Sequence, residues 1–169
     1  MKIITLPNEL NLNSSPFFSV YNHESNKEIS KQQSLLNKNT FNFLQEETKE
    51  VFFDNYSFSI DNSQFLLIKS GKCLMTEKLS SVKEKYNSIH FFFSNEDVLK
   101  FIRKFQLNQT NTKAHYSTYS YKFDGFIRSF ANSILDISKL SKSIQKNILK
   151  AKFEEIIWYL IEFKGVDFL

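Results

Sequence analysis

The sequence is poor in cysteine, glycine and long apolar runs, and each shortage excludes a class of structure. Cys73 is the single cysteine among 169 residues, so the chain can form no internal disulfide and has no cysteine cluster for zinc. Its three glycines, Gly71, Gly125 and Gly165, are too far apart for a phosphate-binding loop. No run approaches the ~18 apolar residues of a membrane span, and the N-terminus lacks a secretion signal. We therefore expect a cytoplasmic protein that does not bind membranes.

Arginine is scarce as well. The chain has 22 basic and 18 acidic residues and a formal net charge of +4, but only Arg103 and Arg128 are arginines. Duplex and base recognition usually draws on clustered arginine, whose planar fork pairs with phosphate and guanine. Here the lysines are scattered among glutamates, so the sequence does not support a nucleic-acid site within residues 1–169.

Residues typical of catalysis do not form a constellation. None of the three histidines, His23, His90 and His115, has a glutamate or a second histidine at the spacing of a metal site. Each is better explained as a surface or hydrogen-bonded histidine than as a ligand or base. Cys73 is flanked by a strand-like sequence and is better explained as an apolar filler than as a reactive thiol. We expect no cofactor, no metal and no enzyme activity.

Phenylalanine is abundant, and it supplies a core. The 19 phenylalanines and a hydrophobic content of 41% predict a folded chain, and its length fits one domain over residues 1–169. Short apolar or alternating runs separated by turn-like clusters predict five or six strands, mainly between Thr40 and Phe93, with one more at 16–21. Such spacing is typical of a β-sandwich or small barrel, which we place at about 17–93.

Helices follow the strands. Ser94 and Asp97 form a capping box that predicts a helix at about 95–105. Residues 106–120 form a polar loop, and Asp124 then caps a second helix at about 124–140. A third helix at about 143–163 carries apolar residues at spacings of four and three. Strands first and helices afterwards make the fold class α+β.

The apolar stripe of the third helix has two explanations, which the sequence leaves open in equal measure. It packs within its own chain, or part of it forms the seam of a dimer. The candidates for a dimer interface are Leu149, Phe153, Ile156, Ile157 and Leu160.

The order of these segments resembles a known family. Strands at 64–72 and 87–94, a short helix, a spacer and the helical segment 148–160 resemble the N-terminal regulatory domain of AraC-type transcriptional activators, particularly the group that regulates type III secretion. The resemblance implies a cupin-like β-barrel followed by helices. It also implies a C-terminal pair of helix-turn-helix motifs that binds DNA, for which about 100 further residues would be needed after Gly165. We therefore expect a fragment of a longer regulator that contacts DNA only through that missing part.

By resemblance, the chain is the sensing and dimerisation domain of such a regulator, a homodimer that responds to a small effector or to a partner protein. Metal-binding cupins bring several histidines and a glutamate into the barrel, and this chain has no such set. The alternatives are a free-standing cupin-like enzyme and a protein-binding adaptor. Pocket candidates on the predicted strands, which otherwise simply fill the barrel, are Phe43, Phe58, Phe65, Leu67, Met75 and Phe91.

Overall fold

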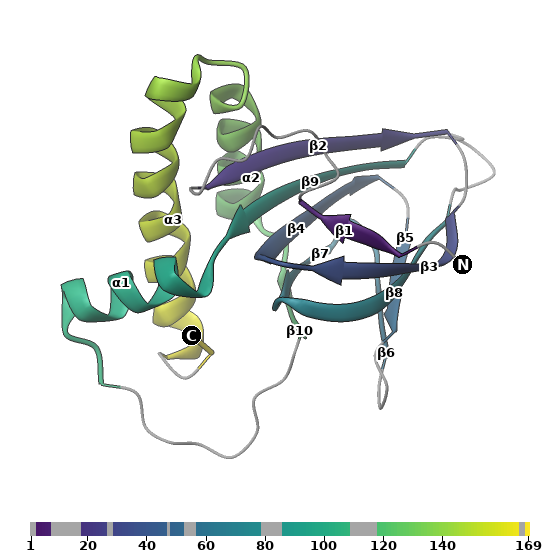
Figure 1. Ribbon diagram of the computed structural model, residues 1–169, viewed down its shortest axis with the longest axis horizontal. Coiled ribbons are helices and arrows are strands. Elements are labelled where there is room, and N and C mark those ends of the chain that lie inside the picture. Colours follow the sequence, from purple (N-terminus) through teal and green to yellow (C-terminus); the bar gives the residue numbers. More distant parts are fainter. Residues whose placement is uncertain are drawn as a thin grey trace.

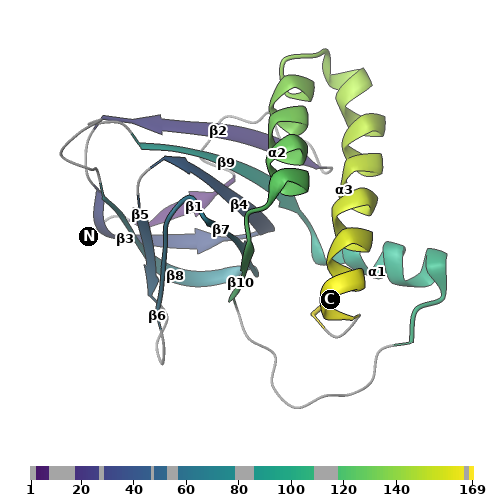
Figure 2. The same ribbon diagram turned by 180° about the vertical axis from the view of Figure 1, so that it is seen from behind.

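The fold is a sandwich of two β-sheets with three helices gathered at one side of it (Figures 1 and 2). A computed structural model describes residues 3–7, 18–26, 29–46, 48–52, 57–78, 86–108, 118–165 and 168–169. The strands are β1 (Ile4–Leu6), β2 (Ser19–Ser25), β3 (Ile29–Leu36), β4 (Asn39–Glu46), β5 (Thr48–Phe52), β6 (Ser57–Ile60), β7 (Gln64–Ile68), β8 (Gly71–Lys78), β9 (Tyr86–Phe93) and β10 (Thr118–Lys122). The helices are α1 (Asn95–Phe105), α2 (Gly125–Ile137) and α3 (Lys142–Lys164).

The strands divide equally between the two sheets. Sheet A has the order β1-β3-β8-β5-β6 and sheet B the order β10-β7-β4-β9-β2. Neighbouring strands are antiparallel except β1 and β3, which are parallel. Within the described residues no strand pairs with both sheets, so the β part is a sandwich rather than a closed barrel. This confirms the α+β class and decides between the two β architectures that the sequence allowed.

Sheet B is buried on both faces, because it is the middle layer between sheet A and the helices. In β4, Phe41 and Phe43 belong to the core shared with the helices, whereas Leu44 belongs to the core shared with sheet A. The same alternation in β9 places Phe91 toward the helices and Phe92 toward sheet A. A strand with two buried faces has a nearly continuous apolar sequence, which explains the Phe-Phe-Phe run at its end.

The helix boundaries lie close to the predicted ones because their signals are local. The Ser94 hydroxyl accepts the Asp97 amide at 3.1 Å while the Asp97 carboxylate accepts the Ser94 amide at 2.8 Å, which is the predicted capping box. The Asp124 carboxylate accepts the Ile127 amide at 2.9 Å and begins α2. The apolar stripe of α2 is buried at Ile127, Phe130, Ile134 and Ile137, as its spacing predicts.

The prediction missed β1, β3 and β10 and shortened β2. Residues 29–36 form β3 although their sequence is polar, and the expected strand at 16–21 is β2, which continues to Ser25. The predicted loop 106–120 ends in β10, which pairs with β7 at the edge of sheet B. Polar strands owe their structure to pairing with other segments of the chain, and a local sequence pattern does not report that pairing.

Candidate functional site

A cavity lies between the two sheets and combines apolar walls with buried polar side chains. Its volume is about 190 Å³. Its lining residues come from β1, β2, β3, β5, β8 and β9, and they are Ile4, Leu6, Tyr21, His23, Gln32, Ser34, Lys49, Met75, His90 and Phe92. Apolar walls with a few convergent polar groups are the usual composition of a small-molecule site.

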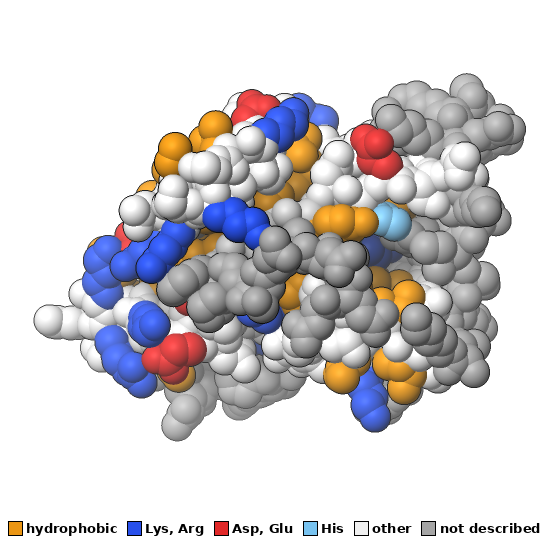
Figure 3. All heavy atoms as spheres, turned by 45° about the horizontal axis from the view of Figure 1, so that its top comes forward, with side chains coloured by type: hydrophobic (Ala, Val, Ile, Leu, Met, Phe, Trp, Pro, Cys, Tyr) orange, Lys and Arg blue, Asp and Glu red, His pale blue; other side chains and the backbone are white. Residues whose placement is uncertain are grey.

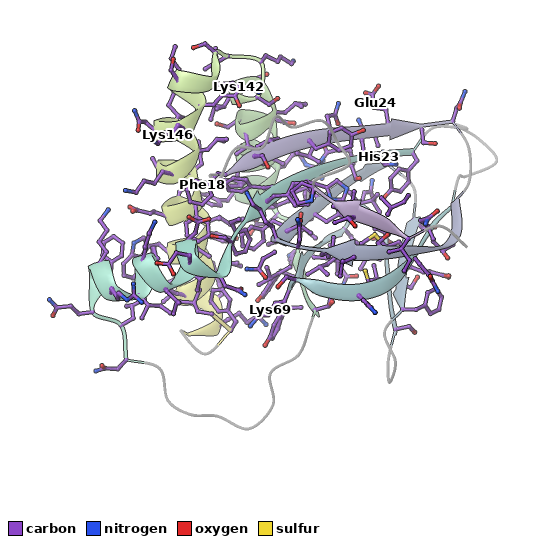
Figure 4. All side chains as sticks on the ribbon, in the orientation of Figure 1. Phe18, His23, Glu24, Lys69, Lys142 and Lys146 are labelled. Atoms are coloured by element: carbon purple, nitrogen blue, oxygen red, sulfur yellow. The ribbon has the colours of Figure 1, made fainter. Side chains whose placement is uncertain are left out.

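The strand register aligns the polar residues of sheet B across the floor of this cavity. His90 in β9 lies opposite Asn42 in β4 and opposite Tyr21 in β2. The Asn42 amide nitrogen is 3.1 Å from His90 Nε2, and the Ser88 hydroxyl is 3.1 Å from the same atom. The imidazole also stacks on Phe92 at 5.8 Å between ring centroids. His90 is therefore held in one orientation by three neighbouring side chains, and His23 approaches from β2 (Figure 4).

Burial keeps His90 uncharged. Desolvation lowers the pKa of His90 well below its usual value of 6.5, and the nearby Lys49 and His23 lower it further. A neutral imidazole can donate one hydrogen bond and accept another. The floor of the cavity is therefore polar but carries no charge of its own at neutral pH.

Lys49 supplies the charge in this cavity. It lies on β5 in sheet A, and only 1% of its surface is exposed. Removing an ammonium group from water costs several kcal/mol, so a lysine is rarely buried to this extent. The ammonium group lies close enough to Cys73 to oppose the effect of burial, which raises the pKa of that thiol to about 11. The inter-sheet cavity thus combines a buried lysine with apolar walls, and Cys73 is the inert buried cysteine that its sequence context predicts.

Of the predicted pocket residues, the structure brings only Met75 to this cavity. Phe43, Phe65 and Phe91 lie on the opposite face of sheet B, in the core shared with the helices, so their assignment to a pocket is corrected to core packing. Leu67 lines a different cavity of about 230 Å³ between sheet B, α1 and the end of the chain, next to Lys69. Phe58 belongs to β6, and its side chain is outside the described part of the structure.

The prediction missed Lys49, whereas His90 is hydrogen-bonded, as the sequence predicted. The sequence carries a signal for the inner position of both residues. Asn42 and His90 each interrupt a run of large apolar residues, and Lys49 precedes the buried Val51 by two positions. In a strand, residues two apart share a face, so these polar residues belong to an inner face. His115, the third histidine, lies outside the described residues.

The dimer candidates on α3 are buried in their own chain. Leu149, Phe153, Ile156, Ile157 and Leu160 are each no more than 2% exposed, in the core formed with sheet B and α2. Phe153 alone contacts Phe18 and Phe93, each at 5.0 Å between ring centroids. Intrachain packing, one of the two explanations left open, therefore accounts for this stripe, and the five residues form no surface that a second copy could contact.

Other apolar side chains of the helices remain exposed. Phe163 on α3 is 65% exposed, and Phe126 on α2 is 41% exposed. Tyr159 lies between them, with ring centroids 4.3 Å from Phe126 and 4.9 Å from Phe163. The Tyr159 hydroxyl donates to the Asp124 carboxylate, which fixes the tyrosine against the start of α2. We call Phe126, Tyr159 and Phe163 the aromatic cluster.

A two-sheet sandwich with helices packed on one sheet and a cavity between the sheets is the architecture of cupin-like regulatory domains. The chain belongs to the family of ExsA N-terminal regulatory domains, whose model matches residues 39–168. It is thus the N-terminal regulatory domain of an AraC-type transcriptional regulator, which confirms the resemblance seen in the sequence. No curated protein matches the chain.

Solved structures of ToxT from Vibrio cholerae have the same fold. An apo variant from strain SCE256 has a TM-score of 0.68 at 11% identity, covering 90% of this chain and 60% of that chain. ToxT from strain O395 has a TM-score of 0.59 at 12% identity, covering 92% of this chain and 58% of that chain. A third structure, wild-type ToxT with a bound unsaturated fatty acid, has a TM-score of 0.56 at 12% identity, covering 91% of this chain and 58% of that chain. The chain thus spans about three fifths of the length of ToxT.

None of the described helices is long and apolar enough to cross a membrane. In the same residues, no three histidine, cysteine, aspartate or glutamate side chains are grouped so that they could hold a metal ion.

Proposed function

We propose that this regulatory domain senses an anionic amphiphile, a molecule with one carboxylate and an apolar body, in the cavity between its sheets. The observation that carries this proposal is Lys49, an ammonium group that is 1% exposed and lines an otherwise largely apolar cavity. A carboxylate that enters the cavity would interact with this ammonium in a medium of low dielectric constant, where a charge pair is stronger than in water.

The chemistry of the ligand is supported by the ToxT structures. One of them holds an unsaturated fatty acid and another holds (E)-4-(8-methylnaphthalen-1-yl)but-3-enoic acid. Both ligands combine a carboxylic acid with an apolar body. The cavity described above offers the same two features, with Lys49 and His90 for the head group and Ile4, Leu6 and Phe92 for the body.

Ligand binding would act as a signal rather than as the first step of a reaction. A ligand shifts an equilibrium between two arrangements of a protein only by its difference in affinity for them, typically 1–3 kcal/mol. The cavity and the helices contact opposite faces of sheet B, so a change at His90 reaches the helical core through β9. A DNA-binding domain attached to this one would respond to that change, and residues 1–169 themselves would neither bind DNA nor catalyse a reaction.

Homodimerisation belongs to the same proposal but uses a different surface from the one that the sequence suggested. The aromatic cluster exposes two phenylalanines on adjacent helices, and the stacked rings form one apolar surface. Two copies that apply this surface to each other would bury it in the self-complementary manner of a twofold dimer.

Thermal unfolding with oleate tests the ligand proposal. We expect oleate to raise the Tm of the wild-type chain, because a ligand that binds only the folded state stabilises it. Oleyl alcohol, which has the same apolar body without the carboxylate, should raise the Tm much less.

The variant Lys49→Met removes the positive charge of the cavity with little loss of side-chain volume, and it should abolish the difference between the two ligands. The matched control Lys72→Met, at an exposed lysine of β8, should behave as the wild type. Equal stabilisation of the Lys49→Met and wild-type proteins by oleate would refute the proposal.

A further inference from the structure

A groove between α1 and the first half of α3 combines an aromatic floor with a lysine rim. Its volume is about 400 Å³, larger than that of the inter-sheet cavity. We call it the lysine groove. Its lining residues are Phe18, Asp97, Lys100, Phe101, Lys104, Lys146, Asn147, Lys150, Phe153 and Glu154. The groove lies on the helical side of sheet B and shares no lining residue with the inter-sheet cavity.

Lysines repeat at helical spacing on both walls of this groove. Lys100 and Lys104 are four residues apart on α1, and Lys146 and Lys150 are four residues apart on α3. Lys142 precedes Lys146 by one further turn (Figure 4). Like charges at this spacing disfavour a helix, so the fold tolerates an unfavourable local arrangement on both walls. Figure 3 shows basic side chains gathered over this helical end of the molecule.

The two carboxylates of the groove are already engaged. Glu154 accepts a hydrogen bond from Lys104 at 2.7 Å. The Asp97 carboxylate accepts the amide and the hydroxyl of Ser94, each at 2.8 Å, in the capping box of α1. Lys104 is the partner of Glu154, so it is the positive charge of Lys100 and Lys150 that favours a negatively charged partner.

The floor of the groove is apolar. Phe18 is half-buried, and its ring centroid is 5.0 Å from that of Phe153, which in turn lies 6.2 Å from Phe101. An apolar side chain of a partner could therefore enter between the lysines and cover Phe18. An apolar anchor in a groove with a charged rim is the arrangement by which amphipathic helices are recognised.

We propose that the lysine groove binds an acidic amphipathic helix of a partner protein, with its apolar side chains on Phe18 and its carboxylates on the lysines of α1 and α3. Nucleic acid fits this surface less well. The lining has no arginine, and two of its three aromatic rings are too deeply buried for bases to stack on them. This partner site stands apart from the effector cavity and does not depend on the proposed ligand.

A fluorescein-labelled helical peptide of glutamate and leucine, with leucine at every third and fourth position, is the probe. Fluorescence anisotropy with the full chain should show saturable binding that weakens about tenfold between 50 and 200 mM salt, since several charge pairs form at the rim. A peptide with lysine in place of glutamate should not bind.

Two charge reversals locate the site. Lys100→Glu combined with Lys150→Glu should weaken binding about tenfold or more. Lys72→Glu combined with Lys122→Glu changes the net charge equally at exposed lysines of β8 and β10, and it should change the affinity less than about twofold. Phe18→Ser should weaken binding without altering the salt dependence. Circular dichroism confirms that each variant is folded.

Three results would overturn the proposal. The first is the absence of saturable binding of the acidic peptide. The second is an equal loss of affinity in the two charge-reversed variants, which would show that only net charge matters. The third is tighter binding of a single-stranded oligonucleotide than of the peptide at the same salt concentration, which would make the groove a nucleic-acid site.

Discussion

At the scale of single residues, the most informative positions are polar side chains on otherwise apolar strands. Asn39 begins β4, and its side chain donates to Asn95 at 2.9 Å and accepts the Ser70 amide at 2.9 Å. It therefore ties the start of α1 to the turn between β7 and β8. Asn42, His90 and Lys49 instead give the inter-sheet cavity its polarity. Buried polar groups of this kind are costly unless their partners are in place, so each one specifies its surroundings.

His90 should make the stability of the protein depend on pH. The pKa of the folded state lies well below 6.5, whereas the unfolded chain binds the proton near that value. Below pH 6.5 the unfolded state therefore holds more protons, and the free energy of unfolding should fall by up to about 1.4 kcal/mol per pH unit. Urea denaturation at several pH values between 7.5 and 5 measures this slope. His90→Gln should reduce the slope below pH 6.5, and an unchanged slope would contradict the assigned burial of His90.

At the scale of elements, the sequence predicts the helices well and the strands incompletely. The capping box at Ser94 and the apolar stripe of α2 each involve residues that lie close together in the sequence. The helix boundaries can therefore be predicted from local interactions. β3 and β10 are polar and exist because distant strands pair with them, which no local pattern reports. Only part of the predicted pocket lies at a cavity, Met75 at the inter-sheet cavity and Leu67 at another, for a related reason. In the sequence, large apolar residues such as Phe43 and Phe91 suit a pocket and a core equally well, and they lie on the face of sheet B that packs against the helices.

The packing of α3 gives a prediction at this scale. Phe153 is 2% exposed and its ring meets those of Phe18, Phe93 and Phe101, so Phe153→Ala should lower the free energy of unfolding by about 3–5 kcal/mol. Ile144→Ala, at a 48% exposed position on the same helix, is the matched control and should change it by no more than about 0.5 kcal/mol. Chemical denaturation of both variants measures the difference. Equal losses would mean that α3 does not pack on sheet B as described.

At the scale of the whole molecule, sheet B lies between two surfaces to which we assign different proposed roles. One face of the sheet lines the inter-sheet cavity, and the other forms the core with α2 and α3, which carry the aromatic cluster. The lysine groove lies at the junction of α1 with α3, beside the same core. A regulatory domain built in this way can keep ligand, second copy and partner protein at separate places and still link them through one rigid layer.

The aromatic cluster should determine the oligomeric state. Phe126→Asp combined with Phe163→Asp should convert a dimer into a folded monomer in light scattering, because carboxylates would be buried against each other in the interface. Leu99→Asp, at a 43% exposed position on α1, should leave the dimer intact. A wild-type chain that stays monomeric at all accessible concentrations, or a double variant that still dimerises, would rule out this surface as the interface.

A crystal structure of the protein with bound oleate tests the sensing role most directly. The carboxylate should lie between the two sheets within about 3 Å of Lys49 Nζ, with the apolar body against Phe92 and Met75. A ligand found instead in the cavity beside Lys69 and α1, or a crystal grown in saturating oleate with no ligand between the sheets, would contradict it.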